Sequence, residues 1–523
     1  MPASKGKDAI LPGPAMAKCI PVPDRKAGTE PREESIEPCI LVILGATGDL
    51  TSRKLMPALF HLYLSKRLPQ PFSIVGCGRT VLDDDQFRGS MSGALHDAGL
   101  TDREDTAGFL SSVHYLALQY DDLASFERLA AYLGKLDREI CAGHSTLFYL
   151  ALPPALYAPV VEKLGQVRLA SGDERGRGRI RLVVEKPFGR DLASAVKLDR
   201  TIHEYFQEKQ IFRIDHYLAK ETVQNILMFR FANAIFEPLW NRRYIDSVRI
   251  SATETLGVEH RAGYYEQTGV VRDMFQNHMM QLLALTAMEP PSVFEAERVR
   301  DEKIKVHRSL RPFQVDAIKE DLILGQYESG TINGQKVLSY RKEQGVADHS
   351  LTPTYAMMKL YVENWRWQGV PFFLVSGKRL AEKKSEISIR FKPVPHSMFS
   401  NILGGKITAN QLILGIYPDE RIKLTFQTKT PGARLSLQSV VMDFHYQERC
   451  TDNQTEAYEK VLLDCMLGDQ MLFWRQDGVE ACWAFLTPIL SECESCSDKA
   501  KMLHFYESGR WGPSAAEKIL NAP

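Results

Sequence analysis

The sequence predicts two fold classes in one chain. An N-terminal doubly wound α/β domain is followed by a larger α+β domain, whose big, mainly antiparallel sheet is flanked by helices. Before about residue 215, short apolar runs alternate with helical stretches, which is the pattern of parallel βαβ units. After that point, six segments alternate apolar and polar residues, which is typical of an antiparallel sheet with one solvated face. Helical stretches at 271–288 and 454–489 flank these segments.

The first domain is expected to begin with the strand Ile40–Leu44. Five apolar residues in a row are too short for a helix and suit a strand buried on both faces. The next stretch places Leu55, Leu59 and Leu62 on one helical face, and "FSIVGCGR" then supplies a second buried strand. The segments "STLFYLALPP" and "IRLVVEKPFGRD" predict two more. Four such strands between residues 40 and 190, separated by helices, predict an open parallel sheet.

A glycine-containing turn, "GATGDL", joins the first strand to the first helix. Glycines let the backbone approach a pyrophosphate, and the free N–H groups at a helix N-terminus bind it. The G-x-x-G spacing is shorter than the usual G-x-G-x-x-G, and a tight strand-to-helix turn is the alternative interpretation. The position between a buried strand and a helix favours a Rossmann-like dinucleotide site. The expected cofactor-binding residues of this turn are Gly45, Ala46, Thr47, Gly48, Asp49 and Leu50.

The end of the second strand predicts which dinucleotide binds. NAD sites usually place an acidic residue there, on the ribose 2′-hydroxyl, whereas this strand ends with Arg79. A guanidinium group can pair with a 2′-phosphate, so we expect NADP, and a surface arginine is the alternative. Lys186 follows the strand Ile180–Val184 at the carboxyl edge of the sheet, where ligands collect, although a solvated lysine would give the same pattern. Tyr149, in a similar strand, is expected either near the cofactor or in the core.

Two further segments carry groups suited to chemistry. "RIDHYLAKE", Arg213 to Glu221, mixes basic, acidic and imidazole groups, and its charges argue against a core strand or core helix, where they would lack partners. His278, in "VVRDMFQNHMMQLLALTAM", would share a helical face with Met274 and Phe275. Such a histidine is either a core residue or a general base, and a base would need an orienting carboxylate and a dry pocket.

The motifs together resemble those of the glucose-6-phosphate dehydrogenase family. The motifs occur in the same order as in that family, and together they cover about residues 38–513. They are "GATGDLTSRKL", "FYLALPP", "VVEKPFGRD", "RIDHYLAKE", "RFAN", "VRDMFQNHMMQ", "VRDEKIKV", "LGQY", "GVPFFLVSGKRL", "AYEKVLLDCMLGD" and "WGP". "RIDHYLAKE" differs from the family signature RIDHYLGKE at Ala219. The resemblance implies NADP-dependent oxidation of C1 of β-D-glucose 6-phosphate to 6-phospho-D-glucono-1,5-lactone, the first step of the oxidative pentose phosphate pathway.

The resemblance also implies roles for individual residues. His278 matches the general base that takes the proton of the C1 hydroxyl, and Asp215 matches the carboxylate that orients its imidazole. The expected substrate-binding residues are Lys186 (shared with the cofactor), His216, Tyr217 and Lys220 (on the 6-phosphate), Glu254 and Asp273 (on sugar hydroxyls), and Lys378 and Lys383. If the segment is helical, His216 and Lys220 share one face at i,i+4.

Several positions depart from the family pattern. Gly415 and Ser388 stand where some members have arginines that hold a second, structural NADP, so we do not expect that second cofactor. Tyr417 stands where glutamine is usual near the substrate, and Lys383 stands where some relatives have arginine.

Composition limits the partners. Lys plus Arg equal Asp plus Glu at 65 each, so no attraction to nucleic acid or to an anionic membrane is expected. The nine cysteines are scattered and odd in number, which fits a reducing, cytoplasmic compartment. No apolar run reaches the roughly 18 residues of a membrane span. No cluster has metal-ligand spacing, so no metal is expected. The resemblance implies a homodimer or homotetramer built through the large sheet.

The predicted organisation is a disordered extension at 1–37, a dinucleotide-binding domain at 38–215, a substrate-binding and oligomerisation domain at 216–513, and a tail at 514–523. Two other functions are compatible with parts of the sequence. An NADP-binding sensor would have no role for Asp215, Lys220 and His278. A dehydrogenase of an unphosphorylated or amino sugar would not need the cations at 216, 220 and 378, which favour a phosphate.

Overall fold

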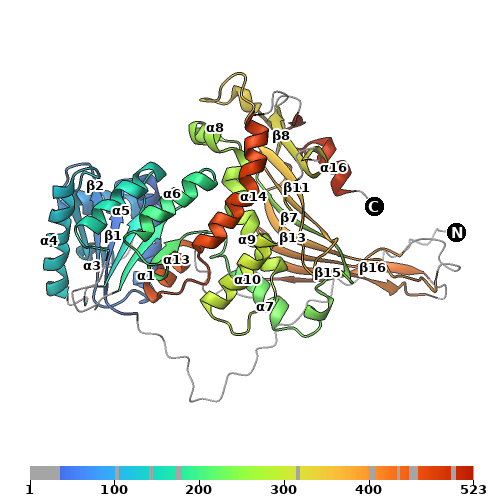
Figure 1. The fold of residues 1–523 in the computed structure, drawn as a ribbon, viewed down its shortest axis with the longest axis horizontal. Helices are drawn as coiled ribbons and strands as arrows, with labels where there is room; N and C mark the ends of the chain where they lie inside the picture. Colours follow the sequence, from blue (N-terminus) through green and yellow to red (C-terminus); the bar gives the residue numbers. More distant parts are fainter. Residues whose placement is uncertain are drawn as a thin grey trace, which may run out of the picture.

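The computed structural model describes residues 36–100, 105–140, 143, 145–170, 179–313, 318–399, 407–432, 436–446, 457–495 and 502–521. Residues 1–35, most of the expected extension, lie outside the described residues, so its disorder stays a prediction. The described chain contains a six-stranded sheet, a nine-stranded sheet and a two-stranded hairpin (Figure 1). The sheet classes are those that the sequence predicts.

The six-stranded sheet is parallel throughout and belongs to the N-terminal part of the chain. Its strands are β1 (Cys39–Leu44), β2 (Phe72–Gly78), β3 (Val113–Ala117), β4 (Thr146–Leu150), β5 (Ile180–Val184) and β6 (Ile211–Arg213), in the order β3-β2-β1-β4-β5-β6. The order reverses between β1 and β4, and doubly wound sheets bind ligands at such a point. The surrounding helices are α1 (Met56–Leu64), α2 (Asp84–Asp97), α3 (Asp105–Ser111), α4 (Leu123–Ile140), α5 (Tyr157–Gln166) and α6 (Leu192–His203).

The sheet has two strands beyond the four expected between residues 40 and 190: β3 lies within that range and β6 follows it. β3 is only partly buried and has no uninterrupted apolar run, and β6 has three residues. The expectation that the charged segment Arg213–Glu221 stays out of a core strand is wrong for its first residue only, because residues 214–220 lie outside any strand or helix. Arg213 ends β6 and is 3% exposed, and its guanidinium group pairs with Asp199 at 2.6 Å and with Glu208 at 2.8 Å. Buried partners therefore satisfy a charge that the local sequence leaves unpaired.

The nine-stranded sheet forms the C-terminal part. Its strands are β7 (Ile245–Thr253), β8 (Leu322–Glu328), β11 (Tyr355–Tyr361), β12 (Pro371–Gly377), β13 (Lys384–Phe391), β14 (Gln411–Tyr417), β15 (Arg421–Lys429), β16 (Leu437–His445) and β17 (Leu503–Glu507), in the order β16-β15-β14-β13-β7-β12-β11-β8-β17. β7–β12 and β8–β17 are parallel pairs, and the others are antiparallel. β9 (Gly330–Ile332) and β10 (Gln335–Val337) form the hairpin. The alternating pattern predicts six of the nine strands; it misses β11 and β12, which are largely buried and do not alternate, and the edge strand β17.

Further helices follow the first sheet in the chain, and some of them lie between the two sheets. They are α7 (Glu221–Phe231), α8 (Ala262–Val270), the π-helical stretch η6 (Val271–Met279), α9 (Met280–Ala287), α10 (Ala296–Arg308), α11 (Ile318–Asp321), α13 (Ala457–Leu467) and α14 (Gln476–Ser495). The first domain also contains a short π-helical stretch, η1 (Thr51–Leu55), directly before α1. Figure 1 shows α9, α10 and α14 between the sheets. α13 returns to the first domain and packs against α1, where Leu462 and Cys465 join the same hydrophobic core as Leu41 and Leu59.

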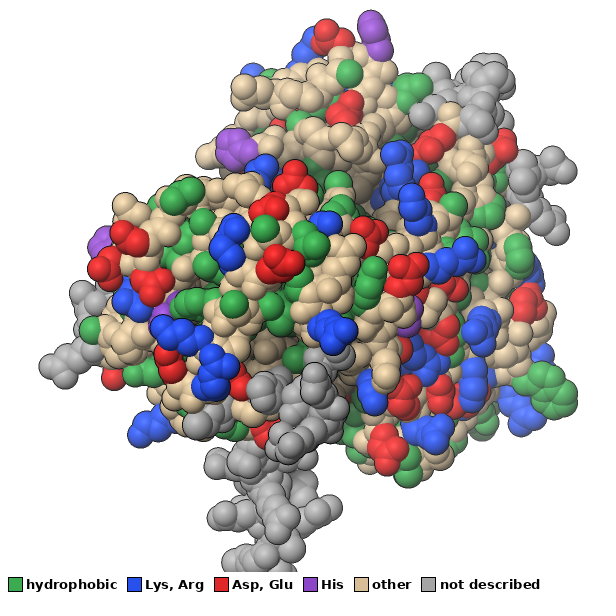
Figure 2. All heavy atoms as spheres, turned by 60° about the vertical axis from the view of Figure 1, so that its left-hand side comes forward, with side chains coloured by type: hydrophobic (Ala, Val, Ile, Leu, Met, Phe, Trp, Pro, Cys, Tyr) green, Lys and Arg blue, Asp and Glu red, His purple; other side chains and the backbone are tan. Residues whose placement is uncertain are grey.

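The C-terminal segment 514–523, expected as a tail, contains the helix α16 (Ser514–Leu520). Arg249 Nη2, on β7, donates a hydrogen bond to the carbonyl oxygen of Leu520 at 2.6 Å, so this helix is attached to the large sheet. None of the helices in the described part of the chain has both the length and the apolar character that a membrane crossing needs. Acidic and basic side chains are interspersed on the face drawn in Figure 2.

Candidate active site

Strand ends from both sheets meet at one place. In the six-stranded sheet, β5 ends just before Lys186 and β6 ends just before Asp215, both at the carboxyl edge. In the large sheet, the parallel strands β7 and β12 end next to Glu254 and Lys378. β13 runs opposite to β7, so its beginning, directly after Lys383, lies at the same end of the sheet. Topology therefore gathers residues that are far apart in the sequence.

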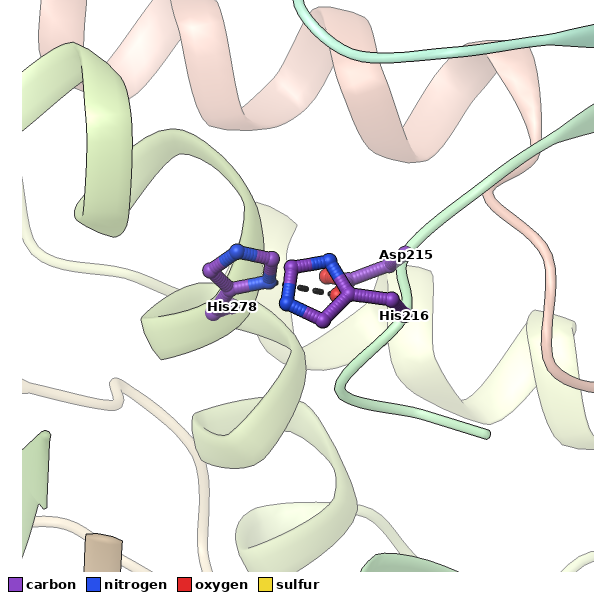
Figure 3. A group of neighbouring side chains, drawn as sticks. All are labelled: Asp215, His216 and His278. Atoms are coloured by element: carbon purple, nitrogen blue, oxygen red, sulfur yellow. Dashed lines mark hydrogen bonds and ion pairs between the residues drawn. The ribbon is translucent and has the colours of Figure 1, made fainter. Parts of the chain in front are cut away.

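His278 and Asp215 form a buried hydrogen-bonded pair. His278 reaches from η6, and its Nδ1 lies 2.5 Å from Oδ1 of Asp215, on the segment after β6 (Figure 3). Both residues are almost fully buried, at 1% and 3% exposure. The backbone N–H of Tyr217 also donates to Oδ1 of Asp215, at 3.0 Å. The sequence-based pairing of these two residues is therefore present in the structure.

The charges of this pair follow from its surroundings. Burial lowers the pKa of His278, and the charge of Lys186 adds to this effect, while Asp215 opposes it. Burial alone would raise the pKa of Asp215, but its interaction with His278, which includes the hydrogen bond to Nδ1, lowers it below its usual range. A neutral imidazole that donates from Nδ1 to an ionised carboxylate fits both directions. Nε2 is then the nitrogen that can accept a proton.

Lys186 connects the pair to Asp273. Its ammonium group lies 3.0 Å from Nε2 of His278, 3.2 Å from the carbonyl oxygen of Asp273 and 3.5 Å from Oδ1 of Asp273. The charge of Lys186 helps to lower the pKa of the Asp273 carboxyl, although burial opposes this. The peptide bond between Lys186 and Pro187 is cis. Lys186 and Asp273, both expected at the site, are thus direct neighbours of the base.

A second group of cations lies beside the pair. The ammonium group of Lys220 lies 4.0 Å from the ring centre of Tyr217 and 5.2 Å from that of Tyr417. Lys383 lies 4.6 Å from the ring centre of Tyr417. His216 packs its ring edge against His278, with ring centres 4.7 Å apart. Burial, together with the charge of His278, lowers the pKa of His216.

His216 and Lys220 do not share a helical face, so the condition under which i,i+4 spacing would align them is not met. Residues 216–219 form a turn, and α7 begins only at Glu221. The turn, rather than i,i+4 helical spacing, brings His216 to the ring of His278 and Lys220 to the ring of Tyr217. A β-strand leads into this segment and a helix leads out, so the turn chemistry of the short connection decides its shape.

Glu254 and Lys378 form an ion pair at the end of the large sheet. The Lys378 side chain is 12% exposed, and its ammonium group lies 5.3 Å from the ring centre of Tyr265. The charge of Lys378 also contributes to the lowered pKa of Asp273. Carboxylates paired with ammonium groups are suited to binding several hydroxyl groups at once.

The glycine turn after β1 has the shape that a pyrophosphate needs. Gly45 has φ +95°, and a Cβ there would lie 2.1 Å from the carbonyl oxygen of Ala151, so a side chain does not fit. Thr47, Gly48 and Asp49 are exposed, whereas Ala46 is buried, so Ala46 could contribute only backbone groups. The turn therefore offers backbone and short polar groups at the carboxyl edge of the sheet.

Two cofactor candidates have different surroundings. Arg79 directly follows β2 and is exposed, so its guanidinium group is available to a ligand. Tyr149 is fully buried in β4, and its hydroxyl group lies 2.6 Å from Oε1 of Glu185. The side chain of Tyr149 thus supports the residue next to Lys186, and only its backbone could contact a cofactor. The sequence reasoning missed Glu185, although it directly precedes Lys186.

One cluster in the described residues has donor atoms spaced as a metal site would need. Atoms of Asp215, His216 and His278 lie within 4.8 Å of one another. Two of the three are already joined by the hydrogen bond between His278 and Asp215. The expectation that the reaction needs no metal stays a prediction.

Two family models match consecutive parts of this chain, from residue 42 onward. "Glucose-6-phosphate dehydrogenase, NAD binding domain" matches residues 42–225, and "Glucose-6-phosphate dehydrogenase, C-terminal domain" matches residues 227–523. The chain belongs to the glucose-6-phosphate dehydrogenase family. The family assignment inferred from the ordered motifs is confirmed, and its dinucleotide-binding domain coincides with the six-stranded sheet.

Relatives within this family cover nearly the whole chain. A glucose-6-phosphate 1-dehydrogenase of Aggregatibacter actinomycetemcomitans is 45% identical over 484 residues, 92% of this chain and 96% of its own. The glucose-6-phosphate 1-dehydrogenase of Treponema pallidum is 42% identical over 490 residues, which are 93% of this chain and 94% of its own. A solved glucose-6-phosphate dehydrogenase in complex with glucose 6-phosphate superposes with a TM-score of 0.84 at 36% identity, covering 92% of this chain and 97% of its own. The crystal structure of the Mycobacterium avium glucose-6-phosphate 1-dehydrogenase superposes with a TM-score of 0.78 at 33% identity, covering 92% of this chain and 96% of its own.

Proposed function

We propose that this protein oxidises C1 of β-D-glucose 6-phosphate to 6-phospho-D-glucono-1,5-lactone with NADP, the first step of the oxidative pentose phosphate pathway. Family membership supports the reaction class. The observation that carries the proposal is the buried His278–Asp215 pair, whose Nε2 points away from Asp215 toward a group of ammonium and carboxylate side chains.

His278 is the proposed general base. Nε2 takes the proton of the C1 hydroxyl while the C1–H bond breaks and the C1=O bond forms. Asp215 holds the imidazole with Nδ1 protonated and stabilises the imidazolium that results. A bound nicotinamide supplies the acceptor for the hydride that leaves C1. The remaining site residues orient the sugar so that its C1 hydroxyl lies at Nε2.

The substrate-binding residues divide by chemistry. We assign the 6-phosphate to His216, Tyr217, Lys220 and Lys383, the sugar hydroxyls to Glu254, Asp273 and Lys378, and a position between sugar and cofactor to Lys186. Charge-assisted hydrogen bonds from ammonium groups favour a phosphate dianion over a neutral hydroxymethyl group. This distribution favours a phosphorylated sugar over the alternative of an unphosphorylated or amino sugar.

For the cofactor, we propose NADP, held by the turn Gly45–Leu50 and by Arg79. The left-handed backbone at Gly45 fits the close approach of a pyrophosphate. Arg79 is exposed at the end of β2, where the ribose 2′-position lies in doubly wound folds. A guanidinium group there favours the 2′-phosphate of NADP. On the same resemblance we propose a cytoplasmic homodimer or homotetramer.

The test is an initial-rate assay that follows the absorbance of reduced nicotinamide. We expect turnover with glucose 6-phosphate and NADP, much slower turnover with free glucose, and a preference for NADP over NAD. His278→Asn protein is the control for contaminating activity. Binding of NADP without turnover of any sugar phosphate would instead support the sensor alternative.

A further inference from the structure

The ring of Tyr417 lies beside two of the proposed phosphate-binding cations. The ammonium groups of Lys383 and Lys220 lie 4.6 Å and 5.2 Å from its centre, and Lys383 donates to its hydroxyl oxygen at 3.4 Å. Tyr217 also contacts Lys220, with its ring centre 4.0 Å from the ammonium group. Lys220 therefore contacts two aromatic rings, and Tyr417 contacts both lysines. Tyr417 ends β14, whereas Lys220 directly precedes α7.

Bringing the two ammonium groups together is unfavourable when no anion is bound. Burial, helped by the charge of Lys383, lowers the pKa of Lys220 to about 8, against the opposing charges of Asp215 and Glu420. The negative face of an aromatic ring attracts ammonium groups and partly offsets this repulsion. An aromatic residue between the two lysines is therefore a means of keeping both close while the site is empty.

Packing alone does not explain this side chain. Tyr417 is 39% exposed, so its ring is not part of the closed core of the large sheet. β14 is attached to α7 independently of the ring, because Oγ1 of Thr222 donates to the carbonyl oxygen of Ile416 at 3.2 Å. Since Lys383 donates to the hydroxyl oxygen of Tyr417, the hydroxyl hydrogen is left to be donated to an anion.

We propose that Tyr417 is a positioning residue of the phosphate site, whose ring holds Lys220 and Lys383 at one anion and whose hydroxyl group donates to that anion. This inference rests on the proposed function. Its ligand class is a phosphate monoester, and it assigns no part in proton transfer to Tyr417. Loss of the ring should therefore weaken binding of the phosphate and leave the chemical step intact.

The experiment compares Tyr417→Leu and Tyr417→Phe with Tyr244→Leu, which removes an exposed tyrosine elsewhere on the protein. Tyr417→Leu should raise KM for glucose 6-phosphate and the inhibition constant of inorganic phosphate by about 5–30-fold. Tyr417→Phe keeps the ring and should fall between Tyr417→Leu and the wild type. kcat, KM for NADP and kcat/KM for free glucose should stay within about twofold of the wild type, as for Tyr244→Leu.

Each outcome bears on the inference. Unchanged phosphate inhibition in Tyr417→Leu overturns it, even if the wild type oxidises glucose 6-phosphate as proposed. Equal losses on glucose and glucose 6-phosphate, with a lower melting temperature, would show a merely structural role and also overturn it. Absence of wild-type turnover would contradict the proposed function. The inference about Tyr417 would then be tested by calorimetry, which measures binding of inorganic phosphate to the same variants.

Discussion

The ammonium group of Lys186 lies 3.0 Å from Nε2 of His278, the ring nitrogen that faces away from Asp215. Both ring nitrogens of the proposed base are therefore engaged before any sugar arrives. Nδ1 donates to the carboxylate, and Nε2 accepts from a cation, which disfavours its protonation. The C1 hydroxyl of a sugar must take the place of Lys186 at Nε2, and the displaced ammonium group remains beside the reacting carbon.

Replacing the base should remove turnover and spare binding. We expect His278→Asn to lower kcat by about 10²–10⁴-fold, because amide groups do not accept protons at neutral pH. KM for glucose 6-phosphate should change little, since the phosphate contacts are untouched. Steady-state kinetics on protein free of wild-type enzyme measure both constants. Retention of a tenth of the wild-type kcat would refute the assignment.

The pH profile should reflect the lowered pKa of His278. A base works unprotonated, so activity falls as pH drops through its pKa. Because burial and Lys186 lower that pKa below 6.5, kcat/KM for glucose 6-phosphate should decline only below pH 6.5. Lys186→Met removes one lowering charge and should move this decline to higher pH, whereas Lys197→Met, an exposed change on α6, should not. An unmoved decline in Lys186→Met would show that another group titrates.

Phosphate binding should weaken in alkaline solution. The pKa of Lys220 is about 8, lowered mainly by burial, so its ammonium group loses its proton above that pH. KM for glucose 6-phosphate should rise there. Lys220→Ala should raise KM about 10–150-fold at neutral pH and remove this alkaline rise. The exposed Lys209→Ala serves as control. If free glucose is affected as strongly, Lys220 does not act on the phosphate.

Cofactor preference should depend on Arg79. Arg79→Ala should weaken the binding of NADP by about 10–100-fold, because one charge-assisted contact to the 2′-phosphate is lost. NAD should be nearly unaffected, since it has only a hydroxyl at that position. The ratio of kcat/KM for the two cofactors measures the effect. A constant ratio would point to Arg53, which pairs with Asp49 at 2.7 Å in the glycine turn, and Arg53→Ala would then be the informative variant.

The sequence predicted those parts of the fold in which local pattern and environment agree. β1 and β5 are buried on both faces, and their apolar runs indicate this directly. β11 is equally buried, but its surroundings come from distant elements, so neither alternation nor flanking turns mark it. Arg213 looked unsuited to a core because its partners, Asp199 and Glu208, are recognisable only in three dimensions.

The sequence predicted the identity of the main site residues better than the contacts between them. The motif order identified the family and, through it, His278 and Asp215, which lie 63 positions apart in the chain. Their hydrogen bond depends on the crossing of β6 and η6, which local spacing does not encode. The i,i+4 spacing of His216 and Lys220 fits a tight turn as well as a helix, so the spacing does not reveal the turn at 216–219. The position of Tyr417 between two lysines depends on the pairing of β13 with β14 and was not predictable from the residues alone.

The return of α13 to the first domain has a consequence for how the chain folds. Leu462, Cys465 and Phe473 complete the core on the α1 side of the first sheet, and Phe473 meets the ring of Phe212 at 5.0 Å. A ribosome delivers all six strands of that sheet well before it delivers these residues. Part of the apolar core on this side of the nascent sheet therefore stays uncovered until synthesis is nearly complete. A fragment that ends near residue 225 should consequently aggregate or recruit chaperones rather than fold alone, so the boundary between the two family models does not mark independently folding units.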